Sequence, residues 1–223
     1  MEQVTLYLLK SAAWLTAFTL VYLLFLQKER FFMLKRIYLL AGVVLSLLLP
    51  LVTLHYRVVI PAPLIPDGQG MTSASPAPAA QITEHADILK WFMIFYIAGI
   101  LLMSGRTLKY LLSVCRTVRS GQVDREGGVL LVRSEKNTFA FSFFNYVFIN
   151  PSLSGREVRE IINHEMVHLS QKHWFDLLLV ELVSIVQWMN PFAWICSARV
   201  RQNHEHLADE EALQRTSDPA AYR

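Results

Sequence analysis

Three long apolar runs occupy the first half of the chain, at residues 4–26, 37–54 and 88–104. Only Lys10 interrupts the first run, and the third continues with a helical pattern toward Val118. Runs of this length fall within the roughly 17–25 residues that a helix needs to cross a bilayer. The first run is too long for the core of a signal peptide, and no small-residue cleavage site follows it. The pattern therefore predicts three transmembrane helices.

The segments between these runs differ in composition. Residues 57–87 are rich in Pro, Ala and Ser, which is typical of a loop without a core. This loop has one basic residue, Arg57, whereas the short loop 27–36 has four and several more follow from Arg106 onward. Positive charges are retained on the cytoplasmic side of a membrane. We therefore expect the N-terminus and the Pro-rich loop outside, and the short loop and everything from about Arg106 inside.

The overall composition agrees with a membrane protein. The chain has 53% apolar and 17% charged residues, against about 25% charged in an average soluble domain. Its net charge of +3 comes from basic residues beside apolar segments, so the expected partner is the lipid bilayer and no direct nucleic-acid partner is expected. Cys115 and Cys196 lie in apolar surroundings without a metal-type spacing, and both are predicted to be buried thiols.

The second half of the chain shows the pattern of a small α+β domain. Strands are predicted at 129–132, directly after a Gly-Gly turn, and at 145–149. The aromatic-rich stretch 139–144 lies between them and has two interpretations: core packing, or an edge strand that pairs with an extended substrate peptide. Ser154 and Glu157 form a capping-box pair, which predicts that a helix starts there.

This predicted helix contains His164, Glu165 and His168 in an H-E-x-x-H motif. Histidines four residues apart lie on one face of a helix and can hold one cation between them. In such motifs the histidines bind zinc, and the glutamate accepts a proton from the water that attacks a peptide carbonyl. The alternative is an ordinary amphipathic helix with its polar residues exposed.

A catalytic zinc ion needs a third protein ligand, and the segment around Glu205 offers one. His204 and His206 are alternative ligands on the same segment. Asp209, one helical turn further on, is predicted to accept the N–H of a ligating histidine. His173 has two interpretations: a position near the site, or the end of the motif helix, where a cation is favourable, and we favour the second.

An apolar stretch at 174–196 separates the two halves of this site and has the hydropathy of a fourth span. A single crossing would place His168 and Glu205 on opposite sides of the membrane, where they could not share an ion. We therefore predict that Asn190-Pro191 breaks the stretch, so that a helix at 174–189 ends and the chain returns. Asn190 is either a turn residue or a hydrogen-bond donor near the site. Glu181 is expected to face protein or a polar cavity.

The chain resembles the gluzincin metallopeptidases, in which H-E-x-x-H is followed by E-x-x-x-D. It is most similar to the membrane signal-transducer metallopeptidases related to the bacterial beta-lactam-sensor and methicillin-resistance regulators. The shared features are the motif at 164–168, Asn190-Pro191 and the E-x-x-A-D run at 205–209. The resemblance extends over nearly the whole chain and favours Glu205 as the third ligand. Family members continue past the equivalent of Arg223 into a further span and an extracellular sensor, so we expect no information on the sensed signal here.

The resulting expectation is a mainly α membrane protein with a membrane domain at 1–104 and a cytoplasmic zinc-peptidase domain at 105–223. The resemblance implies a multi-pass protein of a bacterial cytoplasmic membrane with one Zn²⁺ per chain. Its substrate would be a protein or peptide, such as a transcriptional repressor or the chain itself, cleaved during transmembrane signalling. A quality-control protease of the same group and a non-hydrolytic signalling module are the alternatives. The presence of Glu165 argues against the non-hydrolytic module, because metal binding alone does not require this residue.

Overall fold

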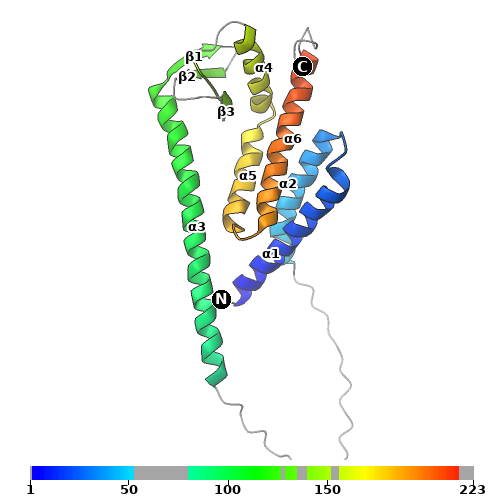
Figure 1. Cartoon of the computed structure of the whole chain (residues 1–223), viewed down its shortest axis with the longest axis vertical. Helices are drawn as coiled ribbons and strands as arrows, with labels where there is room; N and C mark the ends of the chain where they lie inside the picture. Colours follow the sequence, from blue (N-terminus) through cyan, green and yellow to red (C-terminus); the bar gives the residue numbers. More distant parts are fainter. Residues whose placement is uncertain (1, 53–79, 127–128, 135–139, 152–155, 216–223) are drawn as a thin grey trace, which may run out of the picture.

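The structure is a computed structural model that describes residues 2–52, 80–126, 129–134, 140–151 and 156–215 (Figure 1). Residues 57–79 of the predicted Pro-rich loop, the Gly-Gly turn and the predicted cap residue Ser154 lie outside the described residues. The prediction that the loop extends to residue 87 was wrong, because residues 80–87 contain no Pro or Gly and form the start of the long third helix. Among the described residues the protein is mainly helical, with a small sheet beside one end of a long helix. This agrees with the predicted fold class.

Three helices are long and apolar enough to cross a membrane, in the segments Gln3–Leu26, Phe32–Leu51 and Lys90–Ser120. They correspond to α1 (Glu2–Val21) with its π-helical extension η1 (Tyr22–Leu26), to α2 (Phe32–Leu48) with the 3₁₀ turn η2 (Leu49–Leu51), and to α3 (Ala80–Ser120). Helix α2 starts ahead of the predicted position 37, because the basic residues Lys35 and Arg36 continue the helix. The chain is therefore a multi-pass membrane protein.

A four-stranded sheet follows α3. It consists of β1 (Gln122–Glu126), β2 (Val129–Arg133), β3 (Phe141–Phe143) and β4 (Tyr146–Ile149) in the order β1-β2-β4-β3. Strands β2 and β4 are parallel, and both edge strands are antiparallel to their neighbours. The predicted strands are β2 and β4. Strand β1 was not predicted because its sequence Gln-Val-Asp-Arg-Glu lacks an apolar alternation, and it forms only through pairing with β2.

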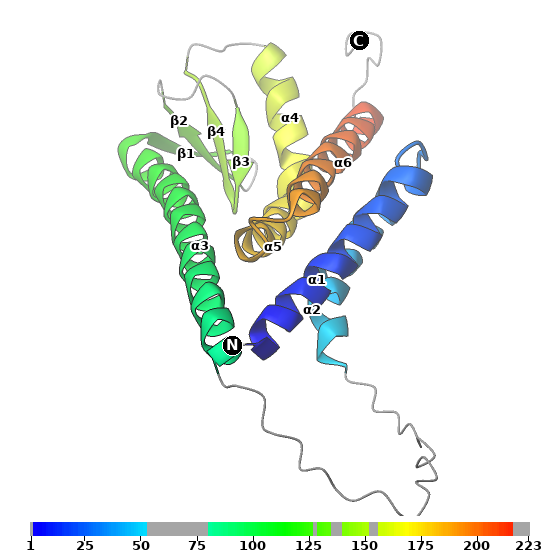
Figure 2. The ribbon, with the colours of Figure 1, turned by 60° about the horizontal axis from the view of Figure 1, so that its bottom comes forward.

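The sheet lies between two helices (Figure 2). One face packs on α4 (Arg156–Ser170), and the other packs on the C-terminal part of α3. Alternation along a strand sends successive side chains to opposite faces. Leu131 thus faces the α4 residues Ile162 and Met166, while Val132 faces the α3 residue Val114. The sheet is therefore the element that brings α3 close to the helix with the H-E-x-x-H motif.

Helices α5 (His173–Val186) and α6 (Pro191–Arg215) form an antiparallel hairpin. The predicted break at Asn190-Pro191 is present. The backbone N–H of Phe192 donates to Asn190 Oδ1 at 3.0 Å, so Asn190 caps α6, and Pro191 occupies the first helical position, where a missing N–H costs nothing. Because the chain turns back, α4 and the C-terminal half of α6 lie side by side.

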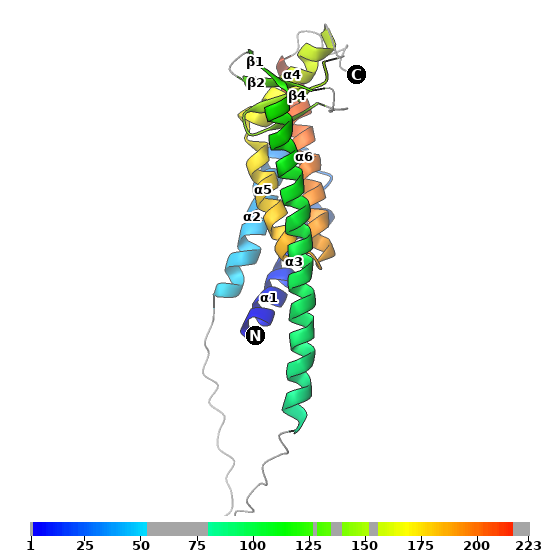
Figure 3. The ribbon, with the colours of Figure 1, turned by 90° about the vertical axis from the view of Figure 1, so that its left-hand side faces the viewer.

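Helices α5 and α6 also pack on the first two membrane helices (Figures 2 and 3). One apolar cluster joins all four helices, and its buried members include Leu15, Leu39, Val180 and Val200. Cys196 belongs to this cluster, whereas Cys115 is exposed. The prediction of a buried thiol at Cys115 was wrong, because its apolar surroundings on α3 are an outward-facing surface and not a protein core.

Candidate active site

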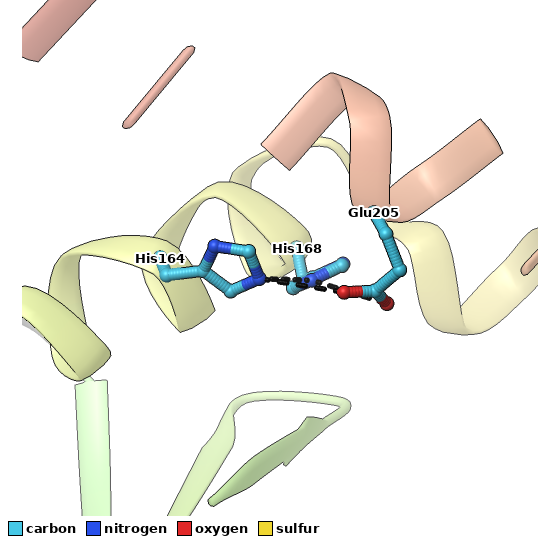
Figure 4. A group of neighbouring side chains, drawn as sticks. All are labelled: His164, His168 and Glu205. Carbon is cyan, nitrogen blue, oxygen red and sulfur yellow. Dashed lines mark hydrogen bonds and ion pairs between the residues drawn. The ribbon is translucent and has the colours of Figure 1, made fainter. Parts of the chain in front are cut away.

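His164 and His168 from α4 meet Glu205 from α6 in one group (Figure 4). The Nε2 atoms of the two histidines are 3.2 Å apart. Glu205 oxygens lie 3.5 Å from His164 Nε2 and 3.8 Å from His168 Nε2. Ligands that bind a tetrahedral zinc ion at 2.0–2.1 Å are about 3.3 Å from one another. The three side chains therefore fit the donor set and the spacing of a zinc site.

The Nδ1 atom of His164 lies 3.4 Å from Asp209 Oδ1. A carboxylate accepts hydrogen bonds, so this contact favours the proton on Nδ1 and leaves a lone pair on Nε2 for a metal. The neighbouring carboxylates have a second effect, on the pKa of this histidine. The hydrogen bond with Glu205 raises the pKa of His164 above its ordinary value, although partial burial acts in the opposite direction.

A second chain of hydrogen bonds fixes the ring of His168. Its Nδ1 lies 2.7 Å from Nδ1 of His173, and His173 Nε2 lies 3.0 Å from Gln171 Oε1. The amide nitrogen of Gln171 donates to Glu211 at 2.5 Å, so Oε1 is the acceptor and His173 carries its proton on Nε2. Nδ1 of His173 must then accept the proton of His168 Nδ1. His168 is left with a lone pair on Nε2, which points at the metal group.

His173 itself is neutral and buried. Burial, followed by the nearby His204 and His168, lowers its pKa to about 2, and its side chain is 2% exposed. The prediction that His173 marks the end of the motif helix was wrong. The motif helix ends at Ser170, and His173 begins α5 after a turn in which Lys172 has a positive φ of 54°. This turn directs the His173 ring back toward His168.

A buried ion pair anchors this arrangement to the second membrane helix. Arg36 of α2 donates from Nε to Asp176 Oδ2 at 2.7 Å and from Nη2 to the backbone carbonyl of Gln171 at 2.7 Å. His204 Nε2 lies 3.0 Å from the same Asp176 oxygen. Burial alone would raise the pKa of Asp176, but hydrogen bonds with His204 and Arg36 outweigh it and lower that pKa below its ordinary value.

The alternative ligands His204 and His206 do not join the metal group. His204 is 2% exposed, bonds Asp176, and stacks on His173 with ring centroids 4.0 Å apart. His206 stacks on Phe32 at the start of α2. On a helix, neighbours of Glu205 point in other directions. Among the described residues, Glu205 is thus the α6 side chain that meets both motif histidines.

Glu165 lies beside this group and is 9% exposed. Its main polar partner from the sheet is Ser142 of β3. Burial raises the pKa of Glu165 above its usual value, while the hydrogen bond with Ser142 and the charge of His164 act to lower it. A carboxylate in these surroundings is a stronger base than one in water.

A cavity of about 550 Å³ opens in front of the group. It is lined by Glu165, His168 and Glu205, by β3, and by parts of α3 and α5. β3 is an edge strand of the sheet. Phe141 stacks on Phe148 with centroids 4.4 Å apart, so the aromatic stretch contributes both to the core and to the cavity wall.

Two polar residues of the apolar stretch have different locations. Glu181 faces the cavity, as expected from the cost of a carboxylate in lipid. Asn190 lies at the other end of α6, fifteen residues before Glu205, which corresponds to about 22 Å of helix. Its Nδ2 contacts Gln187 Oε1 at 2.9 Å and the carbonyl of Ala12 at 3.4 Å. The structure therefore does not bring Asn190 to the metal group. Its contacts are those of a turn residue, which is the first of the two interpretations given for it.

Sequence reasoning missed several residues of the site. No sequence motif marked Ser142, Gln171 or Asp176. Arg36 was used only as one of the basic residues that indicate the membrane orientation. Asp176 carried a usable signal, because an acid inside an apolar run needs a buried partner.

No curated protein matches the chain. Residues 146–221, a segment that begins at β4 and includes α4, α5 and α6 with all three members of the metal group, match the family model described as BlaR1 peptidase M56, which confirms the family resemblance over this segment.

Proposed function

We propose that this chain is a zinc-dependent membrane endopeptidase that acts at the cytoplasmic membrane face. The observation that supports this best is the meeting of His164, His168 and Glu205, which are distant in sequence, beside the buried Glu165. The family match over residues 146–221 points to the same activity.

His164 and His168 would hold one zinc ion per chain through their Nε2 atoms, and Glu205 would hold it through its carboxylate. A bound zinc ion supplies Lewis-acid polarisation of the substrate carbonyl and acidifies water. Asp209 and His173 keep the ligating rings in the required tautomer, and such outer partners typically contribute about 10–100-fold to metal affinity or activity.

Glu165 is the proposed general base. It accepts a proton from the attacking water and delivers that proton to the leaving amine nitrogen. Ser142 orients the carboxyl group, since it bonds Glu165 from the sheet side. The raised pKa of Glu165 suits both steps, because a group whose pKa is closer to neutral can take up and release a proton efficiently.

The edge strand β3 is the proposed binding surface for the substrate backbone. An extended peptide can add to an exposed strand edge through main-chain hydrogen bonds. β3 lines the same cavity as Glu165, so a peptide paired with it would run past the general base. The part of the cavity lining that comes from α5 includes the apolar side chains Trp174, Leu177 and Leu178.

The cytoplasmic location is supported by the position of the basic loop. The α2 end that follows this loop contacts the site region: Asn203 Nδ2 donates to the carbonyl of Phe32 at 3.0 Å, and Arg36 bonds Asp176. The positive-inside rule places this loop in the cytoplasm. We propose a membrane domain at 1–104 and a peptidase domain at 105–223 whose helix α5 is membrane-associated, and a signalling role through cleavage of a regulator or of the chain itself.

The test is Glu165→Gln in purified protein reconstituted in detergent micelles. Hydrolysis of a fluorogenic peptide library should fall by about 10²- to 10⁴-fold, while bound zinc remains at the wild-type level. Glu210→Gln is the matched control, because Glu210 is an exposed glutamate on α6 outside the cavity lining. Activity retained in Glu165→Gln would refute the assignment.

A further inference from the structure

We propose that Arg106 and Arg201 form an anion-binding subsite inside the cavity, which takes a carboxylate of the substrate peptide. The carboxylate would come from an Asp or Glu side chain or from the peptide C-terminus. This inference deepens the proposed peptidase function and rests on it.

The subsite is built around Glu181 of α5. Thr107 donates to Glu181 Oε1 at 2.8 Å. Arg106 Nη2 lies 3.9 Å from the same oxygen, and Arg201 Nη2 lies 3.4 Å from Oε2. All four residues line the cavity. Two guanidinium groups from different helices, α3 and α6, are thus gathered around one carboxylate.

The cluster has an excess of hydrogen-bond donors. Both Glu181 oxygens already have donors beside them, and its side chain is only 19% exposed. Each guanidinium carries five N–H groups, and the described ion pairs use one nitrogen of each. The arginine side chains are 64% and 56% exposed. The cluster therefore has a net charge of +1 and presents donors, which suits an anion and not a cation.

Arg106 also contacts an aromatic ring. Its Cζ lies 5.8 Å from the centroid of the Trp194 ring, a distance at which a guanidinium is attracted to an aromatic face. This contact holds the planar group without using its N–H donors. A planar guanidinium can bind a carboxylate through two parallel hydrogen bonds, which a lysine cannot do.

The distance to the metal group fits a peptide. Arg201 is one helical turn before Glu205, so both lie on the same face of α6 with a rise of about 6 Å between them. An extended peptide advances about 3.3 Å per residue. The bound carboxylate would therefore belong to a residue about two positions from the scissile bond. The other charged residues of the cavity, Glu165 and Glu205, lie at the metal end and have their own roles there.

A purely structural role does not explain two arginines. Exposed ion pairs contribute little to stability, and the Thr107 hydrogen bond already joins α3 to Glu181. Inside a cavity that a peptide closes to water, the same guanidiniums would interact much more strongly with a carboxylate.

The test compares peptides that differ at one position. A peptide cleaved by the wild-type protein is made with Glu, Gln or Lys at each of three positions on both sides of the scissile bond, and with a free or amidated C-terminus. We expect kcat/KM to be about ten-fold higher for Glu than for Gln at one position, and lowest for Lys. In Arg201→Gln and Arg106→Gln the Glu-to-Gln ratio should approach one. Arg199→Gln is the control, because Arg199 donates to Gln202 and does not line the cavity. This variant should keep the wild-type ratio.

A binding measurement separates this inference from the proposed function. A peptide set with Glu, Gln or Lys at each position and a free or amidated C-terminus, chosen without regard to cleavage, is titrated into the Glu165→Gln protein and followed by fluorescence anisotropy. A preference for Glu that Arg201→Gln removes supports the subsite even if the wild-type protein cleaves nothing, in which case the proposed function alone fails. A free acid that binds better than the amide, with no effect of internal Glu, identifies the C-terminus as the source. Equal affinity for all peptides, or a preference that survives in both arginine variants, overturns the subsite.

Discussion

The two walls of the cavity are held in different ways. The helical wall consists of α4, α5 and α6 and carries the metal group. The sheet-side wall consists of β3 and α3. In the helical wall, Arg36, Asp176, His173 and His204 form a buried polar network that connects α2 to the ring of His168. In the described part of the chain, no comparable network holds the sheet-side wall.

Helix α3 is joined to the rest of the molecule at few points. Only 6% of the most apolar segment of α3 is buried inside the protein, whereas the buried share is 22% and 28% in the first two candidate spans. Besides its packing on the sheet, the described hydrogen bonds that join it to other helices and their turn are from Tyr96 to the carbonyl of Val186, from Trp188 Nε1 to the carbonyl of Tyr96 at 3.2 Å, and from Thr107 to Glu181 at 2.8 Å. Under the proposed function, this difference predicts that the chemistry depends on the helical wall and that the sheet-side wall accommodates the substrate.

The largest effect is expected from breaking the anchor of the helical wall. Arg36→Met leaves the buried carboxylate of Asp176 without its cation, and removal of one partner of a buried ion pair typically costs about 3–5 kcal/mol. The free energy of unfolding, measured in detergent micelles, should fall by this amount. Arg30→Met is the control, because Arg30 is exposed, and its effect should stay within about 0.5 kcal/mol. Equal stability of the two variants would contradict the anchoring role.

A smaller effect is expected from loosening the sheet-side wall. A Cβ on Gly99 of α3 would lie 2.1 Å from Trp188 Cε2, so Gly99→Ala must displace Trp188 and break its bond with Tyr96. Overpacking of this kind costs about 1–3 kcal/mol, and we expect zinc content to remain unchanged. In Gly105→Ala the new Cβ meets nothing within 4 Å, and stability should stay level or rise. Loss of zinc in Gly99→Ala would show that the two walls are not independent.

The smallest effect is expected from removing the hydrogen bond between Ser142 of the sheet-side wall and Glu165 of the helical wall. The hydrogen bond from Ser142 lowers the pKa of Glu165, so Ser142→Ala should raise that pKa further. A general base must be deprotonated, so the acidic limb of the kcat/KM profile should move to higher pH. Ser142→Thr, which keeps the hydroxyl, and Ser170→Ala, on the same helix as Glu165, should leave the limb in place. A limb that stays fixed or moves to lower pH in Ser142→Ala would exclude this contact.

The sequence predicted the elements whose signal is local. Apolar runs indicated the three membrane helices, and the alternative of a fourth crossing was excluded because His168 and Glu205 had to meet. Proline at position 191 then gave the location of the break. These inferences work because span length, helix periodicity and proline geometry are properties of short segments.

The rest depends on contacts between distant segments. Strand β1 exists only through its pairing with β2, and the bond between Arg36 and Asp176 joins residues 140 positions apart. Cys115 was misassigned because an apolar neighbourhood on a membrane helix does not distinguish lipid from protein. His173 was placed at the wrong helix end because the turn at Lys172, with its positive φ, has no clear sequence signal.

The central claim is that one zinc ion is held by residues from both sides of the Asn190-Pro191 turn. The most direct measurement is the metal content of purified protein for the wild type, Glu205→Ala and His206→Ala. The account predicts about one zinc per chain in the wild type and in His206→Ala, and a large loss of zinc in Glu205→Ala. A wild-type protein without zinc, or zinc that survives in Glu205→Ala and disappears in His206→Ala, would contradict it.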